Sequence, residues 1–83
     1  MRNNYHIEML LESGLWLYSS VSNQGGYWIL KKRDVWNRRL RFNPYNGYLE
    51  VENPWSCEWS IYEKFLYKVE ITNDKGDIIP WIW

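Results

Sequence analysis

Residues 39–52 read RLRFNPYNGYLEVE and carry the plainest secondary-structure signal in the chain. The pair Asn46-Gly47 favours the positive φ angles of a tight turn. Any register that pairs odd with even residues creates one apolar face, made of Leu40, Phe42, Leu49 and Val51. The opposite face is then charged and consists of Arg39, Arg41, Glu50 and Glu52. The sequence therefore predicts a β-hairpin with one face in the core.

Alternating apolar and polar residues predict further strands on both sides of this hairpin. They cover residues 5–11, 15–21 and 27–32 before it, and residues 57–71 and 78–83 after it. The segment 57–71 reads either as two strands, 57–61 and 65–71, or as one long strand bent at a bulge near Glu63. Residues 73–76 read as a hairpin turn, and Pro80 restricts the last strand to a sheet edge. We expect an all-β fold, a small antiparallel meander of six or seven strands, curled or barrel-like.

Residues 33–39 are ambiguous within this scheme. Leu30, Val35, Trp36 and Leu40 are loosely spaced for one face of a helix, so one short helix is an alternative there. The fold would then be mainly β with that single helix.

The composition supports a single β domain covering residues 1–83. The chain contains no alanine, the best helix former, but has seven Trp, seven Tyr and two Phe, and aromatic residues favour strands. One cysteine and one histidine supply neither an internal disulfide nor a four-ligand zinc site, so we expect no metal and no cofactor. The start of the chain lacks a signal-peptide pattern, and no apolar run approaches the ~18 residues of a membrane span. These features predict a cytoplasmic protein without a membrane partner.

No residue pattern indicates an enzyme. Cys57 and His6 have no flanking catalytic motif, and we expect Cys57 to be buried beside Trp55 and Trp59. Glu50 and Glu52 share a strand face about 6.5–7 Å apart, a spacing that inverting glycosidases use. Arg39 and Arg41 face them across the hairpin, so a solvated ladder of salt bridges is the stronger interpretation.

The aromatic excess is the best clue to function. Sixteen bulky rings exceed what an interior of this size can enclose beside its aliphatic residues, and exposed Trp, Tyr and Arg are typical of interface hot spots. We therefore expect a small non-enzymatic protein that binds another protein. The absence of alanine and the abundance of Asn, Ile and Tyr suggest an AT-rich gene. A narrower hypothesis is thus a phage or mobile-element inhibitor that blocks a host protein.

Two alternatives follow from the charge distribution and from the exposed rings. Residues 27–49 carry six Lys or Arg against one acid, so the basic-aromatic segment 31–42 is a candidate for binding nucleic acid. A homo-oligomer or a structural subunit of a larger particle would also bury exposed rings.

Candidate partner-binding residues come from two parts of the chain. In the middle they are Trp36, Arg38, Arg39, Arg41 and Tyr45. At the C-terminus, a turn at residues 73–76 would put Trp81 and Trp83 on a polar face beside Lys68, opposite the face shared by Ile71 and Ile78.

A 27-residue segment also resembles GYF domains, which bind proline-rich peptides. The matching positions read Trp16-x-Tyr18, Gly26-Tyr27-Trp28, Arg33, Trp36 and Leu40-Arg41-Phe42. The chain departs from the family pattern in lacking its Pro, its Met and the Gly-Tyr that gives the family its name. The resemblance implies a module for proline-rich peptides.

Overall fold

The computed structural model describes residues 4–82 and is all-β over that range. Its eight strands are β1 (Tyr5–Leu11), β2 (Trp16–Gln24), β3 (Tyr27–Arg33), β4 (Arg39–Asn43), β5 (Tyr48–Glu52), β6 (Trp59–Glu63), β7 (Leu66–Asn73) and β8 (Ile78–Ile79). All eight form one antiparallel sheet in the order β6-β5-β4-β3-β2-β1-β7-β8. The antiparallel meander is confirmed, with eight strands rather than the six or seven expected.

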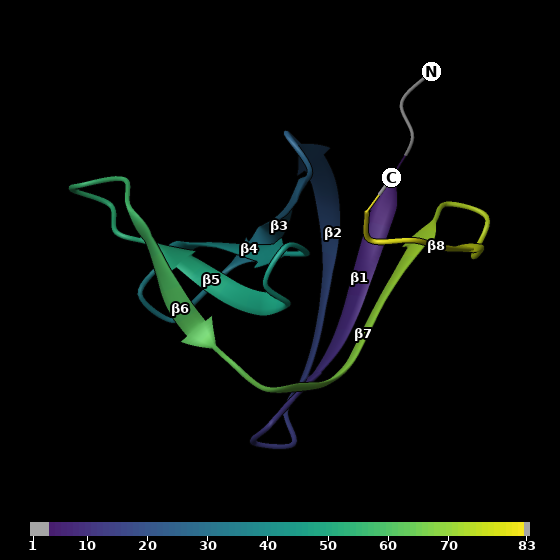
Figure 1. Cartoon of the computed structure of the whole chain (residues 1–83), viewed down its shortest axis with the longest axis horizontal. Coiled ribbons are helices and arrows are strands. Elements are labelled where there is room, and N and C mark those ends of the chain that lie inside the picture. Colours follow the sequence, from purple (N-terminus) through teal and green to yellow (C-terminus); the bar gives the residue numbers. More distant parts are fainter. Residues whose placement is uncertain (1–3, 83) are drawn as a thin grey trace.

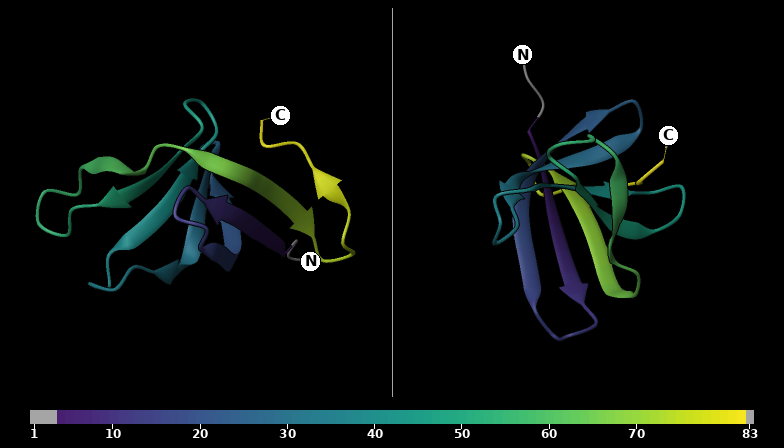
Figure 2. Two further views of the ribbon diagram at one scale, coloured as in Figure 1. Left: turned by 90° about the horizontal axis from the view of Figure 1, so that it is seen from below. Right: turned by 90° about the vertical axis from the view of Figure 1, so that its left-hand side faces the viewer.

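The sheet is strongly curled, and the reason lies in one short connection. Only Lys64 and Phe65 separate β6 from β7, although these strands stand at the first and seventh places of the sheet. A flat sheet would hold them about 29 Å apart at ~4.8 Å per strand, whereas the two-residue link reaches only about 11 Å. The sheet therefore bends until β6 and β7 meet at one corner (Figures 1 and 2). It does not close, because no pairing joins β6 to β7 in the described chain.

The hydrophobic core lies on the inner face of this curl. Its buried residues are Ile7, Met9, Leu11, Leu17, Val21, Trp28, Leu30, Leu40, Phe42, Leu49, Val51 and Ile71. They alternate with exposed or half-buried residues along most of β1 and β3, as expected for strands with one face in a core. The hairpin of β4 and β5 confirms the predicted register, since Leu40 pairs with Val51 and Phe42 with Leu49.

Residues 33–39 form no helix. Arg33 ends β3, Arg39 begins β4, and a tight turn joins them through a hydrogen bond from the Asp34 N–H to the Arg38 carbonyl, 3.0 Å long. Asn37 adopts a left-handed φ of 62°, which the turn requires and which a helix would not tolerate. The helical alternative is therefore wrong for this segment.

The expected orientation of the C-terminal segment is also wrong. Asn73 and Asp77 close the β7–β8 hairpin, so Ile71 pairs with Ile79 rather than sharing a face with Ile78. This one-residue difference turns every following side chain to the other face. Trp81 consequently lies against the core instead of beside Lys68: its ring makes an edge contact with Phe42 at 5.0 Å, and its carbonyl accepts a 2.9 Å hydrogen bond from Trp28 Nε1. Trp83 lies outside the described residues.

No described helix is long and apolar enough to cross a membrane.

Candidate binding surface

Two loops leave the sheet at the same end. Residues 34–38 connect β3 to β4, and residues 53–58 connect β5 to β6. Because Leu40 at the start of β4 pairs with Val51 at the end of β5, the loop before β4 and the loop after β5 lie side by side. The 53–58 loop projects at the far left of Figure 1. Each loop carries one exposed tryptophan.

The first loop is organised by the carboxylate of Asp34. Its Oδ1 accepts hydrogen bonds from the backbone N–H groups of Trp36 (2.9 Å) and Arg38 (2.7 Å). Its Oδ2 accepts a 2.7 Å ion-paired hydrogen bond from the Arg38 guanidinium. Burial acts to raise the pKa of Asp34, but these hydrogen bonds and the Arg38 charge outweigh it, so the pKa lies below its ordinary value of 3.8. Trp36 is therefore presented by a turn that a charged side chain holds in place.

The second loop repeats this arrangement with an amide in place of the carboxylate. Asn53 Oδ1 accepts a 2.9 Å hydrogen bond from the Trp55 N–H, and the Asn53 carbonyl accepts one of 2.8 Å from Cys57. Cys57 adopts a φ of 60°, so it serves as the left-handed residue that returns the chain to β6. Its thiol is exposed, and the expectation that Cys57 is buried beside Trp55 and Trp59 is wrong. In both loops the tryptophan sits two residues after the Asp or Asn that fixes it.

An open cleft of about 470 Å³ lies between the two loops, lined by Trp36, Arg38, Asn53, Pro54 and Trp55. We call this surface the tryptophan cleft. Trp36 is 71% exposed and Trp55 is 92% exposed, which leaves both indoles free to contact a ligand. The Arg38 guanidinium stands over the Trp36 ring, 5.0 Å from its centre, and Asp34 neutralises its charge. The cleft is thus apolar and aromatic, with little net charge of its own.

Arg41 lies on the outer face of the sheet and is committed to internal contacts. Its guanidinium is held between the rings of Tyr27 (4.0 Å) and Trp59 (4.3 Å), and its Nε donates a 2.7 Å ion-paired hydrogen bond to Glu50. Glu50 is only 8% exposed, so this pair is buried and not the solvated ladder expected. Arg39 approaches Glu52 at 3.8 Å and keeps a half-exposed side chain.

The remaining predicted site residues lie elsewhere. Tyr45 stands in the β4–β5 turn, at the opposite end of these strands from the tryptophan cleft, and packs edge-on against Tyr27 at 5.5 Å. Lys68 lies on the outer face of β7, where its ammonium donates a 2.8 Å hydrogen bond to Glu8. That bond is the main cause of the raised pKa of Lys68. The structure therefore brings together Trp36 and Arg38 from the predicted set, but neither Tyr45 nor Lys68.

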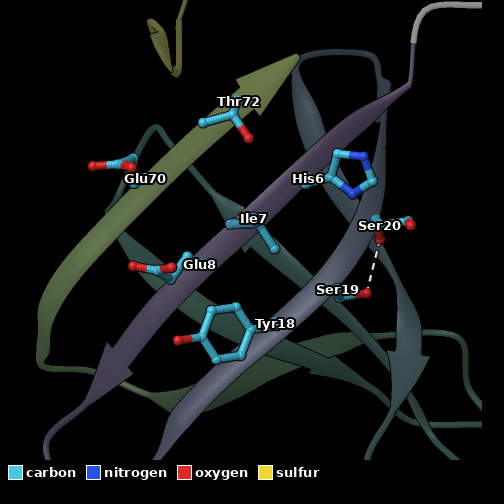
Figure 3. A pocket seen from close by; sticks show the side chains of 8 residues that line it. All are labelled: His6, Ile7, Glu8, Tyr18, Ser19, Ser20, Glu70 and Thr72. Atoms are coloured by element: carbon cyan, nitrogen blue, oxygen red, sulfur yellow. Dashed lines mark hydrogen bonds between the residues drawn. The ribbon is translucent and has the colours of Figure 1, made fainter. Parts of the chain in front are cut away.

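A second hollow lies on the outer face of β1, β2 and β7, and most of the residues that line it carry a polar group (Figure 3). It is lined by His6, Ile7, Glu8, Tyr18, Ser19, Ser20, Glu70 and Thr72. Glu8 pairs directly with Glu70 across the strands, and Lys68 lies within 4.0 Å of both carboxylates. Nowhere in residues 4–82 do three His, Cys, Asp or Glu side chains gather in a way that could hold a metal ion.

Comparison with family models, with curated proteins and with solved structures found no match for this chain. The positions that resemble GYF domains do not form one surface. Trp28 and Phe42 are fully buried, Trp16 and Tyr18 lie on the outer face of β2, and Trp36 belongs to the tryptophan cleft.

Trp55 is the functional candidate that the sequence reasoning missed. A usable signal was present, because Asp34-Val35-Trp36, Asn43-Pro44-Tyr45 and Asn53-Pro54-Trp55 share the spacing of an Asp or Asn two residues before an aromatic ring. In all three the side-chain oxygen accepts the N–H of the aromatic residue, at 2.9 Å. Asn46-Gly47-Tyr48 has the same spacing and the same 2.9 Å hydrogen bond, but Tyr48 is half-buried in β5, so the spacing marks aromatic residues held by a turn without deciding their exposure.

Removing the Asp34 carboxylate should loosen the first loop. We expect Asp34→Ala to lower the free energy of unfolding by about 1–3 kcal/mol at neutral pH, because two backbone N–H groups and Arg38 lose their acceptor. Since the folded-state pKa of Asp34 lies below 3.8, its contribution is present above that pH and is lost as the pH falls through the folded value. Urea denaturation of both proteins at a series of pH values measures this difference. Asp74→Ala in the β7–β8 turn is the control, and an equal loss there, or a difference that persists in strong acid, would contradict the role of Asp34.

Proposed function

We propose that this protein is a non-enzymatic binding module that docks on another protein through the tryptophan cleft. One observation carries the proposal: two tryptophans that are 71% and 92% exposed flank the same cleft, on adjacent loops. Tryptophan is the residue most typical of interface hot spots, and two of them around one hollow form an anchor site.

The energetics of the cleft favour tight binding. Burying a largely exposed indole removes about 150–250 Å² from water, which stabilises a complex by several kcal/mol at roughly 25 cal/mol per Å². The hydrogen bonds that backbone N–H groups donate to the side-chain oxygens of Asp34 and Asn53 already fix the backbone of both loops. Little conformational entropy is then lost on binding, and more of the contact energy appears as affinity.

The charges around the cleft favour a protein partner over nucleic acid. Arg38 is neutralised by Asp34, and Arg41 is enclosed by two rings and paired with Glu50. Two of the cations that would contact phosphates are thus already engaged within the protein. Val35 and Pro54 add apolar surface beside the indoles, which suits a protein partner. The narrower hypothesis of a phage or mobile-element inhibitor stays a prediction from composition.

Comparative affinity purification from the cells that encode this chain tests the proposal. The baits are the wild-type protein, Trp36→Ala/Trp55→Ala, and Trp16→Ala as a matched loss of an exposed tryptophan outside the cleft. We expect a protein that is retained by the wild type and by Trp16→Ala, is lost from the double variant, and stays bound at moderate salt. Nucleic acid that is released steeply as salt rises would support the alternative instead. Equal retention by all three baits would contradict the proposal.

A further inference from the structure

The outer face of β2 carries two aromatic rings that lie side by side. Trp16 and Tyr18 are two residues apart on this strand, so both side chains leave the face opposite that of the core residue Leu17. Their ring planes differ by 18° and their centres are 6.3 Å apart, close to the ~6.4–6.8 Å that separates alternate residues along a strand. The separation therefore runs along β2, and neither ring covers the other.

The flat side of the Tyr18 ring faces solvent. Figure 3 looks onto the outer face of β1, β2 and β7 and shows this ring face-on. Tyr18 is 59% exposed, and Trp16, whose plane is nearly parallel, is 43% exposed. The two rings thus form a flat apolar surface, which we call the aromatic platform. A paired strand holds it, so its geometry is fixed before any ligand binds.

The hollow beside the aromatic platform supplies hydrogen-bonding groups that the fold does not use. It has a volume of about 440 Å³ and is lined by side chains from β1, β2 and β7 (Figure 3). His6, Ser20 and Thr72 make no side-chain hydrogen bond with any residue from 4 to 82. Over the same range the Glu70 carboxylate accepts none either, since the Lys68 ammonium is 4.0 Å away. Donors and acceptors are therefore both available to a ligand in the hollow.

A flat apolar surface next to polar side chains matches the chemistry of a sugar ring. A pyranose has an apolar face of C–H groups and a rim of hydroxyl groups, so it uses both kinds of surface at once. The charges decide which class of sugar fits. Glu8 and Glu70 carry two negative charges against the single positive charge of Lys68, which leaves −1 at the site. This charge repels acidic sugars, and it repels nucleotides through their phosphates although their bases could stack.

We propose that the outer face of β1, β2 and β7 binds a neutral oligosaccharide made of pyranose units. One unit stacks on Tyr18 and the next on Trp16, while their hydroxyl groups bond to the side chains of the hollow. The site shares no residue with the tryptophan cleft, which is built by loops 34–38 and 53–58. Sugar binding is thus a second activity, independent of docking on a protein.

Titration of the isotope-labelled full chain with four neutral oligosaccharides, followed by amide and indole NMR signals, tests the site. The probes are cellohexaose, laminarihexaose, maltohexaose and chitohexaose. We expect at least one of them to bind with a Kd of about 1 mM or lower. The indole N–H signal of Trp16 should shift, while those of Trp36 and Trp55 should not. Tyr18→Ala and Trp16→Ala should each raise the Kd about tenfold or more, because each removes a stacking surface.

Two matched variants are expected to bind the same probe within about threefold of the wild type. Tyr18→Phe keeps the ring and removes only its hydroxyl group. Trp36→Ala/Trp55→Ala removes two exposed rings from the tryptophan cleft and leaves the aromatic platform intact. A probe whose binding is lost in this double variant would occupy the cleft instead, and the proposed sugar site would be wrong.

Glu70→Ala tests the hollow while both rings stay in place. It should raise the Kd about threefold or more by removing an acceptor. It should not weaken the fold, because Glu70 pairs across the strands with another acid, Glu8. Failure of all four probes to bind at about 10 mM overturns the proposal, as does a Kd that ignores Tyr18→Ala, Trp16→Ala and Glu70→Ala. Neither result affects docking through the tryptophan cleft, which is measured with a protein partner.

Discussion

Replacing Trp81 with alanine is expected to lower the free energy of unfolding by about 3 kcal/mol, near the lower end of the range for buried Trp-to-Ala changes. The indole covers Phe42 in the core, and the segment that carries it accepts the hydrogen bond of Trp28 Nε1. Trp81 keeps 38% of its surface exposed, which places the loss below that of a fully buried ring. Urea denaturation followed by circular dichroism measures the change.

The neighbouring residue provides the control for this experiment. Ile82 is 54% exposed, and Ile82→Ala should cost roughly 0.5 kcal/mol or less, as surface substitutions do. A loss for Trp81→Ala as small as that for Ile82→Ala would mean that Trp81 points outward, as the sequence predicted.

Removing the guanidinium of Arg41 is the second large perturbation. Arg41→Met leaves the carboxylate of Glu50, which is only 8% exposed, without its ion-pair partner. Breaking a buried ion pair from one side costs about 3–5 kcal/mol, because the remaining charge stays desolvated. The loss of the contacts with Tyr27 and Trp59 adds to this. We expect the free energy of unfolding to fall by at least about 3 kcal/mol.

A second substitution separates the buried charge from the lost packing. Glu50 also accepts hydrogen bonds from the side-chain amides of Asn43 (3.3 Å) and Asn46 (3.2 Å), and glutamine keeps an acceptor for them without the charge. Arg41→Met/Glu50→Gln should therefore recover about half of the loss or more. Arg39→Met, which removes a half-exposed partner 3.8 Å from Glu52, should cost less than about 1 kcal/mol. A double variant no more stable than Arg41→Met would show that the buried charge is not the cause.

The central hairpin could be predicted in detail because two independent signals agree there. Its side-chain alternation and its Asn46-Gly47 turn require the same parity, and Leu40 and Val51 pair as expected. Burial of Glu50 could not be predicted, since it depends on rings from β3 and β6 that enclose Arg41. Alternation assigns a residue to a face but not the depth to which neighbouring strands cover it.

In the C-terminal hairpin, a shift of one residue in the β7–β8 register determines which face of the sheet Trp81 lies on. Its turn was recognised, but which residues close it depends on the hydrogen bonds that the N–H groups of Lys75 and Asp77 donate to Asn73 Oδ1. With Asn73 and Asp77 as the closing pair, Trp81 joins the core face. Backbone N–H groups donate in the same way to the side chain of Asp34, and these hydrogen bonds stabilise a turn rather than a helix in residues 34–38.

The exposed loops were the hardest part to predict, because their conformation rests on polar side chains rather than on alternation. Trp36 and Trp55 are 19 positions apart in the sequence, and only the pairing of β4 with β5 places their loops side by side. Composition indicated that some rings must be exposed, and the turns at Asp34 and Asn53 determine which ones.

The most direct test of binding through the tryptophan cleft is calorimetric titration of the purified partner protein against the wild type, Trp36→Ala/Trp55→Ala and Trp16→Ala. Each single loss at the cleft should weaken binding by about 2 kcal/mol, so the double variant should show a Kd raised at least thirtyfold. Its unfolding curve should match the wild type because both rings are exposed. Trp16→Ala should bind as the wild type does. A double variant that folds normally and binds with an unchanged Kd would contradict the assignment of the tryptophan cleft as the binding site.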